Sequence, residues 1–363
     1  MIDMRLVAAA AAAMTMGVGA AHADSISPDL YSVTLEVGES VTFTKTVTVS
    51  AGSPTDAKLD VFFLADTTGS MSGQISSARS SASAILSGLS AYGDVQMGVG
   101  EYKDTRDSFT YRTNLGLTDI SDSASIQTAI DTWSARGGGN FPEGNLIALQ
   151  SVANDTDWRA DSTRVVVMFG DAPGHVGGAY PSESDVTGAL NAENITLHIG
   201  NTYGTSLAGM NAASGTIVAG QANRFAAATG GTVVTLSSSG AGMVDLILDA
   251  VDTTFASYSS VDLGIPTIDG LDISYTPLFT TPADGWTREE ERSFEFEVTF
   301  AATEAGVYDF NIPALVDGGQ VALERDIVTV TDDVAAVPLP AALPLYLGAL
   351  LGAGLVIRRR RRS

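Results

Sequence analysis

Oxygen-bearing side chains gather in a short segment that directly follows an apolar run. Asp66, Thr68 and Ser70 lie two residues apart, so in an extended loop their oxygens can face one point. One carboxylate and two hydroxyls suit a hard cation such as Mg²⁺. The same residues could instead form an ordinary polar loop in which Ser or Thr caps a helix. The spacing by itself leaves both interpretations open.

Two further segments carry acids that could complete such a site. Glu143 lies in a Pro-Glu-Gly triplet directly before a helical pattern. It could bind a metal directly or through water, or simply favour the first turn of the helix. Asp171 follows another apolar run and could hold a metal-bound water. His175 is interpreted as a loop residue or a neighbour of the ligands rather than as a ligand.

The elements that would position these loops alternate between strands and helices. A continuous apolar run predicts a buried strand at 61–64, and buried strands are also predicted at 164–169 and 195–199. Further strands are predicted at 95–99, 109–115 and 232–236. Helical periodicity covers 74–89, 124–133, 144–154, 221–229 and 242–255. We therefore expect an α/β domain over residues 58–257, built on a doubly wound, mostly parallel sheet. Such sheets bind ligands at the carboxyl ends of their strands, where Asp66 and Asp171 fall.

The segments on both sides of this domain alternate with the period of two that is typical of β-strands. Residues 30–50 predict a β-hairpin around Gly38-Glu39, in which Lys45 interrupts the apolar alternation. Further strands are predicted at 295–300, 307–312 and 321–330. Neither zone alone closes a sandwich, but residues 24–57 and 258–333 together would. We expect the α/β domain to be inserted in a small antiparallel β-sandwich.

The N-terminus is typical of an exported protein. Residues 1–23 combine Arg5 with an alanine-rich apolar stretch and end in Ala21-His22-Ala23. This pattern predicts a secretory signal peptide with a small-residue cleavage site. A buried N-terminal helix is the alternative interpretation.

The C-terminus, residues 334–363, predicts a transmembrane segment. An uncharged stretch to Ile357 can just span a bilayer, and Arg358–Arg362 would stay on the cytoplasmic side. The string VPLPAALPLYLGALLGAGLVIRRRRR resembles the VPLPA-type C-terminal sorting signals of Gram-negative bacteria. This resemblance implies that an exosortase-type sorting protease removes the tail and that the protein reaches the cell surface or extracellular matrix. A permanent membrane anchor is the alternative.

Charge and cysteine content exclude several classes of protein. The 363 residues include 19 basic and 42 acidic side chains, a net charge of −23. Arg5, Asp3 and Arg358–Arg362 lie outside residues 24–333, so this body has 13 basic and 41 acidic residues, or −28. A nucleic-acid binder needs a basic surface, so that class is excluded. The absence of cysteine excludes disulfides, thiolate zinc sites and cysteine nucleophiles.

The three loops together resemble a known domain. DTTGSM, NFPEGNLIAL and VVVMFGDAPGH occur in this order and spacing, and the match covers 59–257. They resemble the von Willebrand factor A domain, and in detail the integrin β-subunit version, which is inserted in a β-sandwich. The resemblance implies a metal-ion-dependent adhesion site for Mg²⁺, or for Mn²⁺ or Ca²⁺, on Asp66, Thr68, Ser70, Glu143 and Asp171.

The same resemblance raises the question of two neighbouring metal sites of that family. The inhibitory calcium site needs two acids where this chain has Gly73 and Gln74, so we expect it to be absent. An accessory site could use Asp104 and Asn140 with Glu143, although Gly138 stands where an asparagine is expected.

The sequence predicts a non-enzymatic surface or matrix protein that binds a partner through the cation. A partner protein or an acidic polysaccharide would supply a carboxylate. One alternative is a secreted hydrolase in which Asp66, Glu143 and Asp171 hold a metal that activates water. A second alternative is a purely structural matrix protein whose metal only stiffens the loops.

Overall fold

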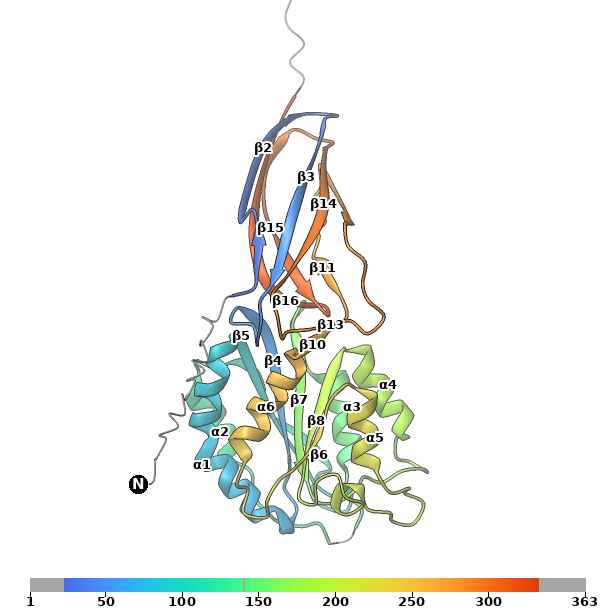
Figure 1. Cartoon of the computed structure of the whole chain (residues 1–363). Helices are drawn as coiled ribbons and strands as arrows, with labels where there is room; N and C mark the ends of the chain where they lie inside the picture. Colours follow the sequence, from blue (N-terminus) through green and yellow to red (C-terminus); the bar gives the residue numbers. More distant parts are fainter. Residues whose placement is uncertain (1–22, 140, 333–363) are drawn as a thin grey trace, which may run out of the picture.

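The computed structural model of the chain describes residues 23–139 and 141–332 (Figure 1). Almost all of the predicted signal peptide, Asn140 and the predicted sorting and transmembrane segment lie outside the described residues. Within the described ranges, no helix combines the length and the apolar character needed to cross a membrane.

A six-stranded sheet forms the centre of the α/β domain, in the order β6-β5-β4-β7-β8-β9. Neighbouring strands run parallel except β5 and β6, which are antiparallel. The strands are β4 (Ala57–Asp66), β5 (Gly93–Tyr102), β6 (Tyr111–Asp119), β7 (Thr163–Gly170), β8 (Ile195–Asn201) and β9 (Val233–Thr235). The predicted doubly wound, mostly parallel sheet is confirmed.

Helices cover both faces of this sheet, so the strands are apolar on both sides (Figure 1). Adjacent residues Phe63 and Phe62 of β4 belong to the cores on opposite faces. The first core includes residues of α1 (Ser72–Leu89), α2 (Ser123–Asp131) and α6 (Met243–Phe255). The second includes residues of α3 (Asn145–Asp155), α4 (Glu183–Ala192) and α5 (Gln221–Ala228). Short 3₁₀ turns are η1 (Gly69–Met71), η2 (Ser90–Tyr92) and η3 (Gly209–Asn211).

The strands on either side of the α/β domain combine into two facing four-stranded sheets, in the orders β1-β3-β14-β12 and β11-β15-β16-β2. The strands from the N-terminal side are β1 (Ser25–Ser27), β2 (Leu30–Glu36) and β3 (Ser40–Val49). Those from the C-terminal side are β11 (Val261–Leu263), β12 (Leu271–Pro277), β14 (Arg292–Ala302), β15 (Gly306–Val316) and β16 (Gly319–Thr331). A further pair joins β10 (Ser257–Tyr258) to β13 (Trp286–Thr287). This arrangement confirms the predicted fold class, with one parallel pair, β2 and β16.

The predicted hairpin at 30–50 is wrong. β2 pairs with β16 in one sheet, whereas β3 pairs with β14 in the other. The rings of Tyr31 on β2 and Phe43 on β3 stack with their centroids 3.7 Å apart. Gly38 makes the connection between the strands with a φ of 91°. The alternation correctly indicates two strands, but burial of both inner faces separates them into different sheets.

A buried ion pair lies where the two domains meet. Asp24, the first residue after the predicted cleavage site, accepts hydrogen bonds from Arg288 Nη1 at 2.9 Å and Nη2 at 2.8 Å. It also accepts from the backbone N of Ser50 at 2.7 Å. The backbone of Arg288 bonds to Gly52 and Ala256. The Asp24–Arg288 pair therefore connects the segment that enters the α/β domain, at Ser50 and Gly52, to the segment that leaves it, at Ala256.

Stability below neutral pH is expected to depend on His198 of β8. The imidazole is buried and hydrogen-bonded to Thr232 Oγ1 at 2.9 Å and Thr254 Oγ1 at 3.0 Å, and burial lowers its pKa to about 4. As the pH falls below about 6.5, His198 is therefore protonated in the unfolded chain before it is protonated in the folded protein, which favours unfolding. We expect this group to remove about 3 kcal/mol of unfolding free energy between about pH 7 and about pH 4.

Urea unfolding of the wild type and of His198→Gln across that range measures the contribution. The variant is expected to be less stable at neutral pH but to lose less stability on acidification. Parallel pH profiles for the two proteins would contradict the assignment.

Candidate functional site

Asp66 ends β4 and is completely buried at the edge of the sheet. Its Oδ1 accepts hydrogen bonds from the backbone N of Thr68 at 2.9 Å and from Thr68 Oγ1 at 2.6 Å. Its Oδ2 is also buried but has no hydrogen-bond partner among the described residues. A buried carboxylate oxygen without a partner is energetically costly, and a donor or a cation at Asp66 Oδ2 would offset that cost.

Thr68 and Ser70 do not cap a helix. Thr68 precedes η1 in an extended conformation and makes no side-chain capping bond. Met71, not Ser or Thr, stands at the N-cap of α1. The capping interpretation of the sequence is therefore wrong. Thr68 is buried with its hydroxyl on Asp66, whereas Ser70 is exposed beside it.

Glu143 approaches the same point from a second loop. Its backbone N donates to Pro173 O at 2.9 Å, and His175 N donates to Glu143 O at 3.0 Å, which ties the second loop to the third. A Cβ on Gly138 would lie 2.5 Å from Thr68 Cβ and 2.9 Å from Glu143 Oε1. Only a glycine leaves room for the Thr68 and Glu143 side chains around this backbone. Glu143 Oε2 is buried without a hydrogen-bond partner among the described residues.

Asp171 adds a third carboxylate, directly after β7. Burial, with a smaller contribution from the charge of Asp171, raises the pKa of Asp66 to about 7. Burial raises the pKa of Glu143 to about 9, with contributions from the charges of Asp66, Asp104 and Asp171 among others. Neighbouring carboxylates thus make ionisation of Asp66 and Glu143 harder. Full ionisation of these carboxyl groups would concentrate negative charge here, and a bound cation would relieve it.

These donors fit a hard divalent cation. Asp66 Oδ2 and Glu143 Oε2 lack partners, and the nearby hydroxyls are oxygen donors of the kind that Mg²⁺ accepts. Within residues 23–139 and 141–332, no group of three or more histidine, aspartate or glutamate side chains is arranged to hold a metal by itself. An ion here would therefore depend on Thr68 and Ser70 as well as on the carboxylates.

The surroundings of Asp104 bear on the predicted accessory site. Asp104 is buried, and its Oδ1 lies 3.0 Å from His175 Nε2 and accepts from Thr105 N at 2.7 Å. Its Oδ2 has no hydrogen-bond partner among the described residues. Asn140, the other predicted ligand, lies outside them. Asp107, which no motif in the sequence indicated, accepts a hydrogen bond at Oδ2 from Gly138 N at 2.9 Å and so shapes the glycine loop.

The two positions that replace acids of the inhibitory site take part in packing. A Cβ on Gly73 would lie 2.1 Å from Ser238 O, so only glycine fits against that loop. Gln74 is buried and donates from Nε2 to Thr202 Oγ1 at 3.3 Å.

A groove of about 670 Å³ opens beside the acidic site and includes Ser70, Glu143 and Asp171 in its lining. Three of its other lining side chains are large, apolar or aromatic, and exposed. Phe141 is 47% exposed, Tyr203 56% and Leu207 68%. These residues lie in loops without hydrophobic periodicity, so no sequence pattern indicated this surface. The groove places apolar contact area next to the carboxylates.

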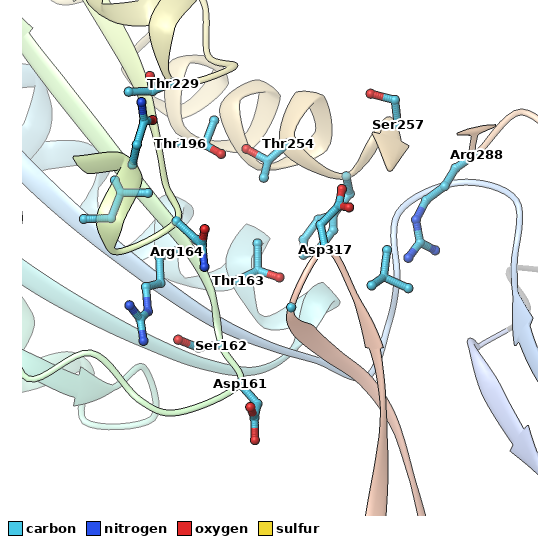
Figure 2. A pocket seen from close by; sticks show the side chains of 16 residues that line it. Asp161, Ser162, Thr163, Arg164, Thr196, Thr229, Thr254, Ser257, Arg288 and Asp317 are labelled. Carbon is cyan, nitrogen blue, oxygen red and sulfur yellow. The ribbon is translucent and has the colours of Figure 1, made fainter. Parts of the chain in front are cut away.

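A second cavity, of about 570 Å³, lies between the two domains (Figure 2). It is lined by the N-terminal ends of β7 and β8, whereas the acidic site lies at the C-terminal ends of the strands. Three of the cavity's charged side chains, those of Arg164, Arg288 and Asp317, are already engaged within the chain. Arg164 Nη1 binds Glu193 Oε2 at 2.6 Å, and Arg288 binds Asp24. Asp317 Oδ1 accepts from the backbone N atoms of Ser259 and Ser260. We interpret this cavity as part of the domain junction.

Comparison with known proteins identifies the α/β domain. The family model of the von Willebrand factor type A domain matches residues 60–237. The search of curated proteins finds no match.

Three solved structures illustrate the similarity. One is a von Willebrand factor type A protein from Catenulispora acidiphila, 13% identical, with a TM-score of 0.43, covering 90% of this chain and 78% of that one. Another is proximal thread matrix protein 1 from the mussel byssus, 17% identical, with a TM-score of 0.40, covering 58% and 48%. The third is the pilus adhesin SpaC from Lactobacillus rhamnosus GG, 11% identical, with a TM-score of 0.36, covering 80% and 46%. The match spans less than half the length of the last two proteins.

Proposed function

Residues 60–237 form a von Willebrand factor type A domain, and from this premise we propose that the protein is a non-enzymatic adhesion protein. Domains of this type generally mediate protein interactions and adhesion. In this proposal a divalent cation, Mg²⁺ or alternatively Mn²⁺ or Ca²⁺, mediates binding of the partner. The residues proposed to hold the cation are Asp66, Thr68, Ser70, Glu143 and Asp171.

The observation that carries this proposal is the pair of buried, unpartnered oxygens, Asp66 Oδ2 and Glu143 Oε2. When bound, the cation neutralises the carboxylates and offers a coordination position to an oxygen of the partner. Thr68 orients Asp66 through two hydrogen bonds, and the bonds between the second and third loops hold Glu143 in place. Exposed Ser70 marks the side from which a partner would approach.

The groove supports a protein partner over an acidic polysaccharide. A carboxylate at the cation would place its neighbouring groups against Phe141, Tyr203 and Leu207, whose exposed surfaces suit an apolar side chain. The body of the protein has a charge of −28, which repels an acidic partner at long range. Binding is therefore expected to tighten modestly as salt screens this repulsion.

We further propose that the protein acts outside the cytoplasm. The signal peptide pattern at 1–23 and the sorting pattern at 334–363 support export to the surface or extracellular matrix of a Gram-negative bacterium. In this proposal the C-terminal segment holds the protein in the membrane until an exosortase-type protease removes it.

A matrix-binding measurement tests the adhesion proposal. Purified protein is expected to bind extracellular matrix from the producing cells in Mg²⁺, and to lose at least about 90% of that binding in chelator or after Asp66→Ala. Asp249→Ala, at an exposed position on α6, is the matched control and is expected to bind normally. Protease treatment of the matrix should remove the binding. Survival of binding after protease treatment, with loss after polysaccharide digestion, would indicate the acidic polysaccharide instead.

The same experiment separates the alternatives that the sequence left open. Cleavage of a matrix component by the wild type, stopped by Glu143→Gln without loss of binding, would contradict the adhesion proposal and support a hydrolase. Stabilisation by Mg²⁺ without any matrix binding would support a purely structural role.

A further inference from the structure

Three ionisable side chains meet in the core of the β-sandwich, where the proposed adhesion function does not use them. Lys45 on β3 and Asp326 on β16 are completely buried, and Glu324 on β16 is 2% exposed. β3 and β16 belong to opposite sheets. Glu324 and Asp326 occupy successive inward positions of β16, between buried Ala322 and Val328. These are positions that a sandwich ordinarily fills with apolar residues.

The contacts of Lys45 with the two acids differ. Its Nζ donates a hydrogen bond to Asp326 Oδ1 at 3.0 Å. It also contacts Glu324 Oε1, yet neither oxygen of Glu324 has a hydrogen-bond partner among the described residues. Lys45 Nζ therefore lies between the two carboxyl groups and forms an ion pair with each of them.

Apolar side chains enclose this cluster and keep it from water. Lys45 lies in register with buried Phe296 of β14, and its Nζ is 5.0 Å from the centre of the Phe43 ring. Glu324 lies in register with buried Ile312 of β15. In such surroundings the neutral form of a carboxylic acid is favoured over its ion. Burial accordingly raises the pKa of Glu324 to about 7.

A single proton transfer makes the cluster reactive without changing its charge. One ammonium and two carboxylates carry a net charge of −1. Moving a proton from the Lys45 ammonium to Glu324 leaves a neutral amine, a neutral carboxylic acid and the Asp326 carboxylate, again −1. The amine is then a nucleophile held against a carbonyl carbon, with a carboxylate beside it that can accept and return a proton.

We propose that Lys45 and Glu324 join in an intramolecular amide bond, with Asp326 carrying the proton during the reaction. The Lys45 nitrogen attacks Glu324 Cδ, and Asp326 takes a proton from the attacking nitrogen. Asp326 returns this proton to the departing hydroxyl of Glu324, so one water leaves and Asp326 ends unchanged. The C–N bond forms as the C–OH bond breaks, and no oxidant or other reactant is needed. Asp326 then accepts a hydrogen bond from the new amide N–H.

The bond would lie where it best resists separation of the sheets. It would connect β3, which precedes the α/β domain, to β16, which follows it, and would close a covalent loop over residues 45–324. β16 begins beside the α/β domain, because a Cβ on Gly319 would lie 2.1 Å from Thr163 Oγ1, and it runs away from that domain (Figure 1). A partner bound to the α/β domain would pull on the sandwich against the C-terminal segment. The covalent bond between β3 and β16 would then resist separation of the two sheets.

Mass spectrometry of the denatured full-length protein tests this proposal directly. The wild type is expected to be lighter by about 18 Da, the mass of one water, than the sequence between its own two measured termini. Lys45→Met, which keeps the side-chain length but removes the nucleophile, should have its full sequence mass. The chain has only three lysines, and Lys58→Met on β4 is the matched control that should keep the mass loss. Fragmentation of the digested wild type should identify a peptide that joins Lys45 to Glu324.

A denaturing gel separates a covalent bond from an ion pair, because only a covalent bond survives denaturation. The wild type should run faster than Lys45→Met on such a gel. Asp326→Asn should slow or abolish the mass loss because it removes the proton carrier. A wild type with its full sequence mass would overturn the proposal, whether or not the variants fold. A bond to Asp326 instead of Glu324 would overturn the assigned roles.

Discussion

The Asp66→Ala variant is expected to bind Mg²⁺ at least about 100-fold more weakly than the wild type, because it removes a central carboxylate of the proposed site. Asp66 lies at the end of a strand and its side chain contacts Thr68 rather than the core, so the fold should survive. Isothermal titration calorimetry measures the affinity. At a Mg²⁺ concentration of about 100 times Kd, the wild type should also gain about 2.7 kcal/mol of stability that the variant lacks.

Gly138→Ala tests the same site without removing a ligand. Its methyl group would collide with Thr68 and approach Glu143 Oε1, and Gly138 has a φ of 69°, which disfavours any other residue. We expect weaker Mg²⁺ binding here too. Gly139→Ala is the matched control, because its Cβ would meet no atom within 4 Å. Equal Mg²⁺ binding by the wild type and Asp66→Ala would refute the proposed ligand set.

Replacing Arg288 with alanine is expected to lower the free energy of unfolding by about 3–5 kcal/mol, since it leaves the Asp24 carboxylate buried without its partner. The Arg288 and Asp24 side chains are 2% and 0% exposed. Because this pair also fixes the segments that connect the two domains, the loss should appear in the sandwich transition of a urea unfolding curve. Near-ultraviolet circular dichroism and tryptophan fluorescence, to which Trp286 contributes, would follow that transition.

The chain provides a close control for this prediction. Arg292 also forms an ion pair, with Glu290, but the two side chains are 35% and 66% exposed. Arg292→Ala should therefore cost less than about 1 kcal/mol. The double variant Asp24→Asn with Arg288→Ala should be more stable than the sum of its single changes predicts. Equal losses for Arg288→Ala and Arg292→Ala would show that burial does not set the strength of the Arg288 pair.

Much of the α/β domain could be predicted because its signals are local. Strands buried on both faces are continuous apolar runs, as in β4, and the helices between them have a clear apolar stripe. Carboxyl ends of parallel strands share one edge of the sheet, so Asp66 and Asp171 were expected to be neighbours. The sequence missed α4, whose only buried residues are Val186 and Leu190, although Ser182 and Asp185 form a capping box that could have indicated it.

In the β-sandwich, the local residue pattern predicts where strands lie but not which strands pair. Alternation predicted strands around residues 30–50, yet it also suggested a hairpin, because a short turn between two strands usually joins neighbours. Which strands pair depends on the face that each must bury. β2 and β3 lie in different sheets because their inner faces, including Tyr31 and Phe43, meet across the core.

The sequence by itself determined most elements of the α/β domain and their order, the mostly parallel sheet and the three loops that carry the proposed oxygen ligands. Those properties follow from residue periodicity and from the geometry that all such sheets share. Only the tertiary structure decided that Asp66 and Glu143 keep unpartnered oxygens and that exposed aromatic side chains flank them. It alone brought Lys45 against Asp326, 281 residues away, because a contact across a core depends on strand pairing in three dimensions and not on local spacing.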